Sequence, residues 1–257
     1  ILLVEESGVA FQKILAREKA YVKLARYIAD VGDDVTHADL HEALPFYKAG
    51  QAARNEQMTL ATAWGYKQHI IIKKTTVDGI DFFSGEKLKE TDINKISVSY
   101  SDHWAYNYSG ELVPFEKLHL MTQAKNYHWS NHHFKNNHRA EENVIPGFNM
   151  IVIDVDGNIN VETVHSLLKD YKFMTYTTKR HEPDGDHRFR LMIPMNYYLE
   201  LDSDEYKEFM NSVMDWLPFQ TDESANQRCK KWECCATGSY HYNLEGELLD
   251  VLNFIPK

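Results

Sequence analysis

The chain has 257 residues, which is enough for one large domain or two smaller ones with a substantial core. No apolar stretch approaches the length of a membrane-spanning helix, and the first residues lack the basic and apolar segments of a signal peptide, so we expect no membrane association. The formal net charge of −10 at pH 7 argues against a uniformly basic nucleic-acid binder. It leaves room for a local basic groove, because the positive residues concentrate late in the chain.

The first residue and the cysteines bear on the setting of the protein. The chain begins at Ile1 and not at Met, so we expect it to be a trimmed or processed piece of a longer protein. Its three cysteines argue against a disulfide framework and fit a reducing compartment, so we expect a cytoplasmic protein. With His241 they form only a loose set that lacks the paired spacing of a zinc site, and we expect no zinc there. These cysteines are Cys229, Cys234 and Cys235.

Helical patterns dominate the start of the chain. Apolar residues at three- and four-residue steps predict an amphipathic helix from Val9 to Ala29. A second helix is expected to begin at Thr36, and a third covers Ala52 to Trp64. We therefore expect residues 1–92 to form a mainly helical accessory region.

The hydrophobic period changes after the third helix. His69–Ile72 and Asp81–Phe83 flank the turn residues Asp78 and Gly79, which predicts short antiparallel strands. The alternation from Ile96 to Tyr100 predicts a further strand. Residues 93–257 are expected to form a separate domain, and the fold class of the whole chain is expected to be α+β.

The most informative stretch is an apolar run that ends in two carboxylates and a glycine. Asn149 to Gly157 predicts a strand buried on both faces, and Asp154 and Asp156 share one face of it because they are two residues apart. Two like charges side by side repel each other, and a divalent cation such as Mg²⁺ or Mn²⁺ is the usual compensation. The alternative is a pair that only shapes the turn before Gly157.

Strands and helices alternate after this run. A helix from about Val161 to Tyr171 and a strand from Phe173 to Thr178 predict a β-α-β crossover or its split variant. Arg188 to Pro194 predicts a third strand. An amphipathic helix follows from Ser203 to Trp216, with acidic residues in its first turn.

Polar clusters lie near the ends of these strands. Three carboxylates, a histidine and several basic groups suit nucleotidyl transfer, in which carboxylates hold two metals about 4 Å apart and basic groups neutralise the triphosphate. Each residue also has a simpler interpretation: a loop histidine, the solvent face of a strand, or a cap of a short helix. The clusters comprise Lys179, Arg180 and His181, then Arg188 and Arg190, then Asp222, Glu223, Arg228, Lys231 and Trp232.

The order of these residues resembles the archaeo-eukaryotic primase superfamily, especially the primase-polymerases of phages and plasmids. Two departures affect the match: Lys179 stands where the family has a small residue, and Glu223 is an alternative to Asp222 as the third acid. The resembling segments are Ile151–Asp156 for the hydrophobic-Asp-x-Asp motif, Tyr176–His181 for the small-x-His motif, Arg188–Pro194 for the basic strand, Asp222 for the third acid, Arg228–Trp232 after it, and Phe134, Lys135 and Arg139 upstream.

The resemblance implies an α/β module joined to an RRM-like catalytic module, with the active site in the cleft between them. It implies two Mg²⁺ or Mn²⁺ ions, nucleoside triphosphates as substrates, a single-stranded DNA template with a primer, and a helicase domain or subunit as a partner in phage or plasmid replication in a bacterial host. The implied catalytic residues are Asp154, Asp156, Asp222 and His181, with the three aspartates as metal ligands. The implied nucleotide-binding residues are His181, Arg188, Arg190, Lys179 and Arg228. The candidates for template contact are Lys135, Arg139, Lys231 and Trp232, with Tyr127 and Trp129 also available for base stacking.

Two rival functions remain open on the sequence. In a haloacid-dehalogenase-type phosphohydrolase, Asp154 would be the nucleophile and Asp156 the acid/base, but Asn158 stands where that family has Thr or Val. The other rival is a non-catalytic RRM-like replication initiator, against which the intact Asp154, Asp156 and His181 count. The sequence leaves open whether synthesis starts de novo and whether ribo- or deoxyribonucleotides are preferred.

Overall fold

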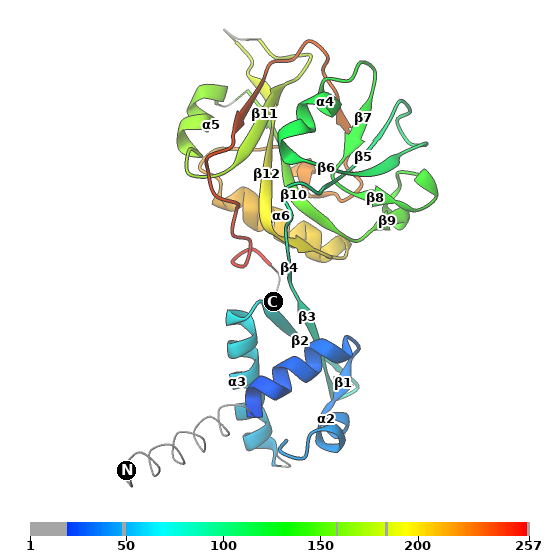
Figure 1. Ribbon diagram of the computed structural model, residues 1–257, viewed down its shortest axis with the longest axis vertical. Coiled ribbons are helices and arrows are strands. Elements are labelled where there is room, and N and C mark those ends of the chain that lie inside the picture. The colour runs from blue at the N-terminus through cyan, green and yellow to red at the C-terminus, as the bar shows by residue number, and fades with distance from the viewer. Residues whose placement is uncertain (1–19, 48–49, 158, 183–184, 256–257) are drawn as a thin grey trace, which may run out of the picture. The chain divides into compact units, whose positions relative to one another are not determined.

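The computed structural model describes residues 20–47, 50–157, 159–182 and 185–255, and its fold class is α+β, as expected. The chain divides into two compact units, residues 1–88 and residues 89–257 (Figure 1). The boundary lies a few residues before the expected one because β4 (Lys89–Glu90) pairs with Tyr197 and Tyr198 of the second unit.

The smaller unit combines helices with a three-stranded antiparallel sheet, so it is less purely helical than expected. The sheet order is β1-β3-β2. Thr36 begins α2 with a capping box, in which it and Asp39 satisfy each other's backbone N–H groups. The expected helix is present over residues 20–31, and its expected start lies outside the described residues. The elements are the helix of residues 20–31, β1 (Val35–Thr36), α2 (His37–Ala43), α3 (Gln51–Lys67), β2 (Ile70–Val77) and β3 (Ile80–Lys87).

One hydrophobic core holds the smaller unit together, with contributions from every helix and from the sheet. Gly85 of β3 passes so close to the backbone of Ala29 that a Cβ atom would lie 2.7 Å from its nitrogen, so only glycine fits there. The buried members of this core are Leu24, Ala25, Ile28, Val35, Leu40, Tyr47, Met58, Ala61 and Phe83.

The larger unit contains two main sheets. The first has the strand order β13-β7-β5-β6, and all of its pairs are antiparallel. Strands β8 and β9 pair with each other as a separate two-stranded sheet. These strands are β5 (Ile96–Ser101), β6 (Ser109–Val113), β7 (His128–Ser130), β8 (His133–Phe134), β9 (Val144–Ile145) and β13 (Trp232–Glu233).

The second sheet carries the acidic run. Its order is β10-β12-β11-β14, again with antiparallel pairs throughout. Strands β10 and β11 flank β12 and are both antiparallel to it, so they run parallel to each other and form the split variant of the expected β-α-β unit. The elements are β10 (Phe148–Asp156), α5 (Val161–Leu167), β11 (Phe173–Thr177), β12 (Arg188–Leu199) and β14 (Tyr240–Asn243).

Buried amides join the two sheets at the first half of β10. Asn149 accepts a hydrogen bond from the backbone N–H of Ser97 at 2.9 Å and donates to the carbonyl of Lys95, also at 2.9 Å. Asn131 donates to the carbonyl of Met150 at 3.0 Å. These hydrogen bonds offset the cost of burying the amides, which therefore fix the strand in place.

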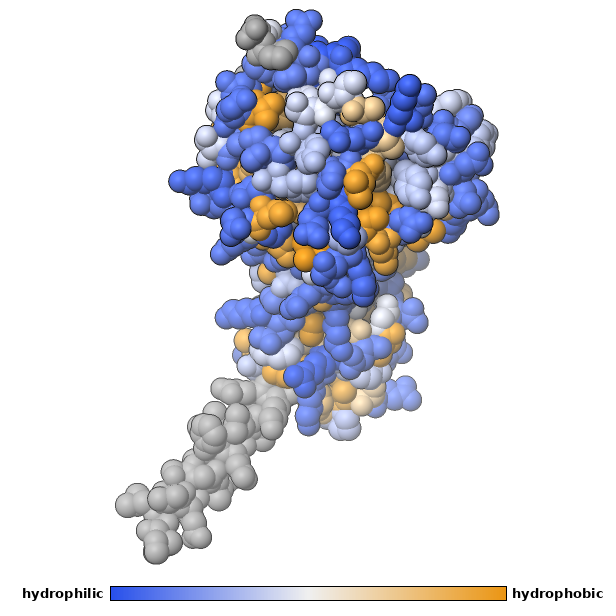
Figure 2. Space-filling model, turned by 45° about the horizontal axis from the view of Figure 1, so that its top comes forward, coloured by the Kyte–Doolittle hydropathy of each residue, from blue (hydrophilic) through white to orange (hydrophobic). Residues whose placement is uncertain are grey.

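The remaining helices cover the sheets. Helix α6 (Ser203–Trp216) has the expected bounds, and a capping box between Asp202 and Glu205 begins it. The other helical elements are α4 (Leu118–Thr122) and the 3₁₀ turns η1 (Phe115–Lys117), η2 (Lys135–Asn137), η3 (Glu141–Asn143) and η4 (Glu223–Asn226). Among the described residues, no helix is long and apolar enough to span a membrane. The face in Figure 2 is mainly hydrophilic, with separate apolar patches.

Candidate active site

The two aspartates at the end of β10 lie directly opposite two arginines of β12. In the antiparallel register Asp154 is paired with Arg190 and Asp156 with Arg188. The Nε atom of Arg190 is 3.5 Å from Oδ1 of Asp154, and Nη1 of Arg188 donates to Oδ2 of Asp156 at 2.8 Å. Opposite charges at directly opposed positions stabilise a sheet, and here they also collect four charged groups at one strand end.

Arg190 is held on several sides. Its Nη1 donates to the hydroxyl of Tyr176 at 2.9 Å and to the carbonyl of Glu233 at 2.6 Å. Its guanidinium carbon also lies 5.4 Å from the ring centroid of Trp232, within the range of a cation–π contact. The Arg190 side chain is only 11% exposed. It is therefore positioned to fix the Asp154 carboxylate, and little of it is open to a ligand.

The third expected acid joins the same cluster. The backbone N–H of Asp222 donates to the carbonyl of Asp154 at 3.1 Å, and the Asp222 carboxylate lies 3.8 Å from Nζ of Lys230. Asp222 also caps η4 by accepting from the backbone N–H of Ser224 at 2.9 Å. Its neighbour Glu223 lines a different cavity, so Asp222 is the acid that the fold brings beside the first pair.

The surroundings shift the pKa values of two carboxyl groups of the cluster in opposite directions. Burial raises the pKa of Asp154, the Arg190 guanidinium opposes this, and the nearby Asp156 and Asp222 raise the pKa further. For Asp222 burial also pushes the pKa upward, but hydrogen bonds from Ser224 and the charge of Lys230 outweigh it and lower the pKa. Asp154 is thus a carboxylate that the fold desolvates and places among both acidic and basic side chains, as is common at functional sites.

His181 lies at the edge of the same cluster. Its Nδ1 accepts a hydrogen bond from the backbone N–H of Arg188 at 3.0 Å, so the neutral imidazole carries its proton on Nε2. Burial, followed by the nearby His187, lowers the pKa of His181 and favours this neutral form. The neutral side chain therefore keeps an N–H donor at Nε2, while Nδ1 lies against the backbone of Arg188.

The donor chemistry of the three aspartates matches hard divalent cations such as Mg²⁺ and Mn²⁺, which prefer carboxylate oxygens. Within the described ranges, no group of three or more His, Cys, Asp or Glu side chains has the arrangement of a metal site. Each of the three aspartates instead contacts a basic side chain: Arg190, Arg188 or Lys230. Metal binding to Asp156 and Asp222 requires Arg188 and Lys230 to give way, whereas the fixed Arg190 lies against Oδ1 of Asp154.

Two expected nucleotide-binding residues lie apart from these contacts. Arg228 is 11% exposed, and its guanidinium is occupied by Glu141, at 2.7 Å, and by the carbonyl of Leu201, at 2.9 Å. Lys179 is exposed in the segment that follows β11.

The expectation that Trp129 and Trp232 stack on bases is wrong for this arrangement, because both side chains are almost completely buried. Trp129 donates its indole N–H to Tyr176, and Trp232 packs on Arg190. Both indoles therefore help to position the charged cluster, and neither offers a ring face to solvent.

The remaining template candidates have different surroundings. Lys135 is exposed, and Lys231 lies 3.6 Å from the carboxylate of Glu233. Arg139 donates from Nε to the carbonyl of Trp104 at 2.9 Å and from Nη1 to the carbonyl of Cys229 at 2.6 Å. Arg139 thus ties the loop after β5 to the chain segment that carries Lys230.

That loop contains an exposed aromatic group that the sequence interpretation missed. Trp104 is 61% exposed and Tyr106 is 52% exposed. The ring of His103 lies 5.6 Å from that of Trp104, and the ring of Tyr106 lies 4.6 Å from that of His138 in a stacked arrangement. We call these four residues the aromatic stack. The sequence signal for it is the run His103-Trp104-Ala105-Tyr106, but exposure cannot be read from composition.

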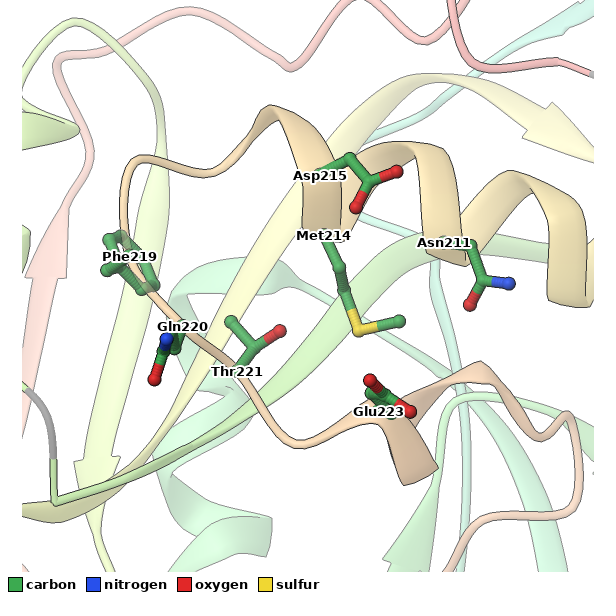
Figure 3. A pocket seen from close by; sticks show the side chains of 7 residues that line it. All are labelled: Asn211, Met214, Asp215, Phe219, Gln220, Thr221 and Glu223. Atoms are coloured by element: carbon green, nitrogen blue, oxygen red, sulfur yellow. The ribbon is translucent and has the colours of Figure 1, made fainter.

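A cavity of about 650 Å³ lies between α6 and the loop before η4 (Figure 3). Asp154, Asp156 and Asp222 are not among the residues that line it, so it is separate from the charged cluster. Its lining residues are Asn211, Met214, Asp215, Phe219, Gln220, Thr221 and Glu223.

Comparison with known proteins adds no relative. No protein-family model matches the chain, and neither a curated protein nor a solved structure matches it.

Proposed function

We propose that the larger unit is a template-dependent nucleotidyltransferase, a DNA primase or primase-polymerase of the archaeo-eukaryotic type. The observation that supports this most strongly is that four separate motifs meet by direct contact. Asp154 and Asp156 pair with the basic strand, Asp222 is bonded to the Asp154 backbone, and His181 accepts from the backbone of Arg188. If each of these residues had only a local role, their gathering in one cluster from distant parts of the sequence would have no explanation.

The proposed roles follow from exposure and contacts. Asp154, Asp156 and Asp222 would hold two Mg²⁺ or Mn²⁺ ions, which when bound lower the pKa of the attacking 3′-hydroxyl and neutralise the leaving pyrophosphate. Arg188, whose side chain is 22% exposed, would turn from Asp156 to the triphosphate. His181 would donate from Nε2 to a phosphate oxygen. Arg190 keeps Asp154 in position.

The aromatic stack supplies a candidate path for the single-stranded template. Exposed rings bind successive bases by stacking, without sequence preference. Arg139 lies against the backbone of Trp104 and can contribute positive charge beside the rings. The same guanidinium reaches Cys229, next to Lys230 of the charged cluster, so the stack belongs to the same part of the unit.

The sheet topology disfavours the phosphohydrolase alternative. That family places its aspartate pair at the end of a parallel Rossmann-like strand, whereas β10 pairs antiparallel with β12. The position opposite each aspartate is taken by an arginine, for which the phosphohydrolase interpretation has no role.

The assay that separates the functions uses the full chain with a primed single-stranded DNA template, labelled nucleoside triphosphates and Mg²⁺ or Mn²⁺. Template-directed extension supports the proposal, and omission of the primer tests synthesis de novo. Phosphate release from a phosphomonoester without extension would support the phosphohydrolase instead. DNA binding with neither activity would support a non-catalytic initiator.

A further inference from the structure

The smaller unit has the element order of a helix-turn-helix module with a β-hairpin. The helix of residues 20–31 leads through β1 to α2 and α3, and the hairpin of β2 and β3 follows (Figure 1). Strand β1 closes the sheet by pairing with β3. In helix-turn-helix modules the second helix of the pair, here α3, lies in the major groove of DNA.

One exposed strip of α3 carries hydrogen-bonding side chains. Met58, Ala61 and Gly65 are buried on the core side. Alongside the buried Met58, α3 exposes an uncharged polar row at steps of four, four and three residues, which keeps the row on one face of the helix. The row consists of Gln51, Asn55, Thr59 and Thr62.

The chemistry of this polar row is unusual for a solvent-exposed helix, which normally carries many charges. Amide side chains can bond adenine with two hydrogen bonds in the major groove, and Thr can contact either a base edge or the thymine methyl group. Exposed Ala52 and Ala63 flank the row, and their short side chains leave room for DNA to approach the helix closely. Glu56 is the sole acidic residue of α3.

Charge is distributed unevenly along the unit: residues 50–77 are net basic, whereas residues 20–47 and 78–88 are net acidic. Residues 50–77, which include α3 and β2, contain four Lys or Arg residues and one Asp or Glu. Residues 20–47, which include the first helix and α2, contain two Lys or Arg residues and five Asp or Glu. The side built from α3 and β2 is therefore the one suited to a polyanion.

The hairpin extends from the same side. Its turn consists of Asp78 and Gly79, both with positive φ, which is the tight geometry of a two-residue hairpin. Val77 and Ile80 at the tip are 51% and 53% exposed. Lys74 lies along the hairpin with a side chain that is 55% exposed.

We propose that the smaller unit binds double-stranded DNA, with the polar row of α3 in the major groove and Lys67, Lys73 and Lys74 against phosphates. The proposal rests on residues 20–88 alone and does not depend on the function proposed for the larger unit. About three phosphate contacts predict a modest salt dependence, with a slope of about −3 in log affinity against log salt. Affinity for the preferred sequence therefore depends on the polar row.

The test is equilibrium binding of the full chain, without nucleotide or divalent metal. A duplex of roughly two helical turns is first enriched from a random-sequence pool and then compared with its separated strands. We expect the Gln51→Ala/Asn55→Ala double variant to lose at least about tenfold in affinity for the enriched duplex, with no change for single strands. Both residues are exposed, so the fold should be retained, and thermal unfolding checks this.

The hairpin offers a matched pair of lysines. Lys74 and Lys87 are both 55% exposed and each pairs with an aspartate, but Lys87 lies at the end of β3 remote from the turn. Lys74→Ala should weaken duplex binding severalfold and reduce the salt slope by about 1, whereas Lys87→Ala should change neither.

Three results would overturn the proposal. They are failure to enrich any duplex over single strands, wild-type duplex affinity in the double variant, and equal effects of the two lysine substitutions. If the double variant instead alters self-association measured by sedimentation while no duplex is bound, the α3 face serves a protein contact and the proposal is wrong. None of these results bears on whether the larger unit incorporates nucleotides.

Discussion

Arg190 lies opposite Asp154 in the antiparallel pair of β10 and β12, with 3.5 Å between Nε and Oδ1. The arginine is fixed by Tyr176 and Glu233, so the aspartate contacts a cation that cannot move away freely. Even with this partner, burial and the neighbouring acids raise the pKa of Asp154. The strand end therefore stores unfavourable electrostatic energy, which a bound divalent cation would relieve.

The first prediction concerns Arg190. Arg190→Met removes the donors to Tyr176 and Glu233 and leaves Asp154 without its counter-charge, so we expect the free energy of unfolding to fall by about 3 kcal/mol. The matched variant is Arg188→Met, whose partner Asp156 is 43% exposed, and it should cost about 1 kcal/mol or less. Urea unfolding at neutral pH measures both. Equal losses would contradict the structural role assigned to Arg190.

The second prediction concerns the charge of Asp154. Because its pKa is raised in the folded state, the protonated form favours folding; this contribution is complete below the unfolded value of 3.8 and is lost as pH rises through the folded pKa. Asp154→Asn should therefore increase the free energy of unfolding at pH 7 by about 1 kcal/mol. The gain should disappear at low pH. A variant less stable than the wild type at pH 7 would show that the Arg190 contact outweighs burial.

Strand β10, which carries the two aspartates, and helix α6 could be predicted from the sequence, because the pattern that defines each element lies within its own segment. The apolar run before Asp154 and the glycine after Asp156 predicted β10, and the period of Ser203 to Trp216 together with the acidic residues in its first turn predicted α6. Such patterns reflect burial of one face or both, which each segment expresses by itself.

The assembly of the cluster could not be predicted in the same way. That β12 lies between β10 and β11, so that Arg190 faces Asp154, depends on the register of strands distant in sequence. The burial of Trp232 and the exposure of Trp104 depend on which sheet covers each ring. The composition indicated that aromatic side chains were available for base stacking, but it did not indicate which of them are exposed to solvent.

The third prediction is an acid sensitivity that arises from His132. This side chain is completely buried beside Phe148 and Tyr206, and burial, followed by Arg228 and His133, lowers its pKa to about 3. Its contribution to stability is present above pH 6.5 and falls by about 1.4 kcal/mol for each pH unit below that, down to about pH 3.

His132→Phe should remove this dependence. Between pH 7 and pH 5 the variant should lose about 2 kcal/mol less stability than the wild type. Thermal or urea unfolding over a pH series measures the difference. Identical slopes for the two proteins would mean that His132 takes up its proton without unfolding.

The fourth prediction concerns the aromatic stack. Trp104→Ala should weaken binding of single-stranded DNA about tenfold, since stacking on one base contributes about 1–3 kcal/mol, while Trp104→Phe should retain most of the affinity. Leu120→Ala is the control, because Leu120 is 67% exposed and lies outside the stack. Fluorescence anisotropy with a labelled oligonucleotide measures all three. Equal effects of the Trp104 and Leu120 substitutions to Ala would exclude the stack from the template path.

The most direct test of the proposed activity compares two aspartates that pair with the same arginine. Asp156 and Asp186 both contact Arg188, but Asp186 is 66% exposed and is not one of the proposed metal ligands. Nucleotide incorporation on a primed single-stranded template with Mn²⁺ is measured for the wild type, Asp156→Asn and Asp186→Asn. We predict incorporation by the wild type and Asp186→Asn, and a loss of at least about a hundredfold in a folded Asp156→Asn. Undiminished incorporation by Asp156→Asn, or none by the wild type, would contradict the account.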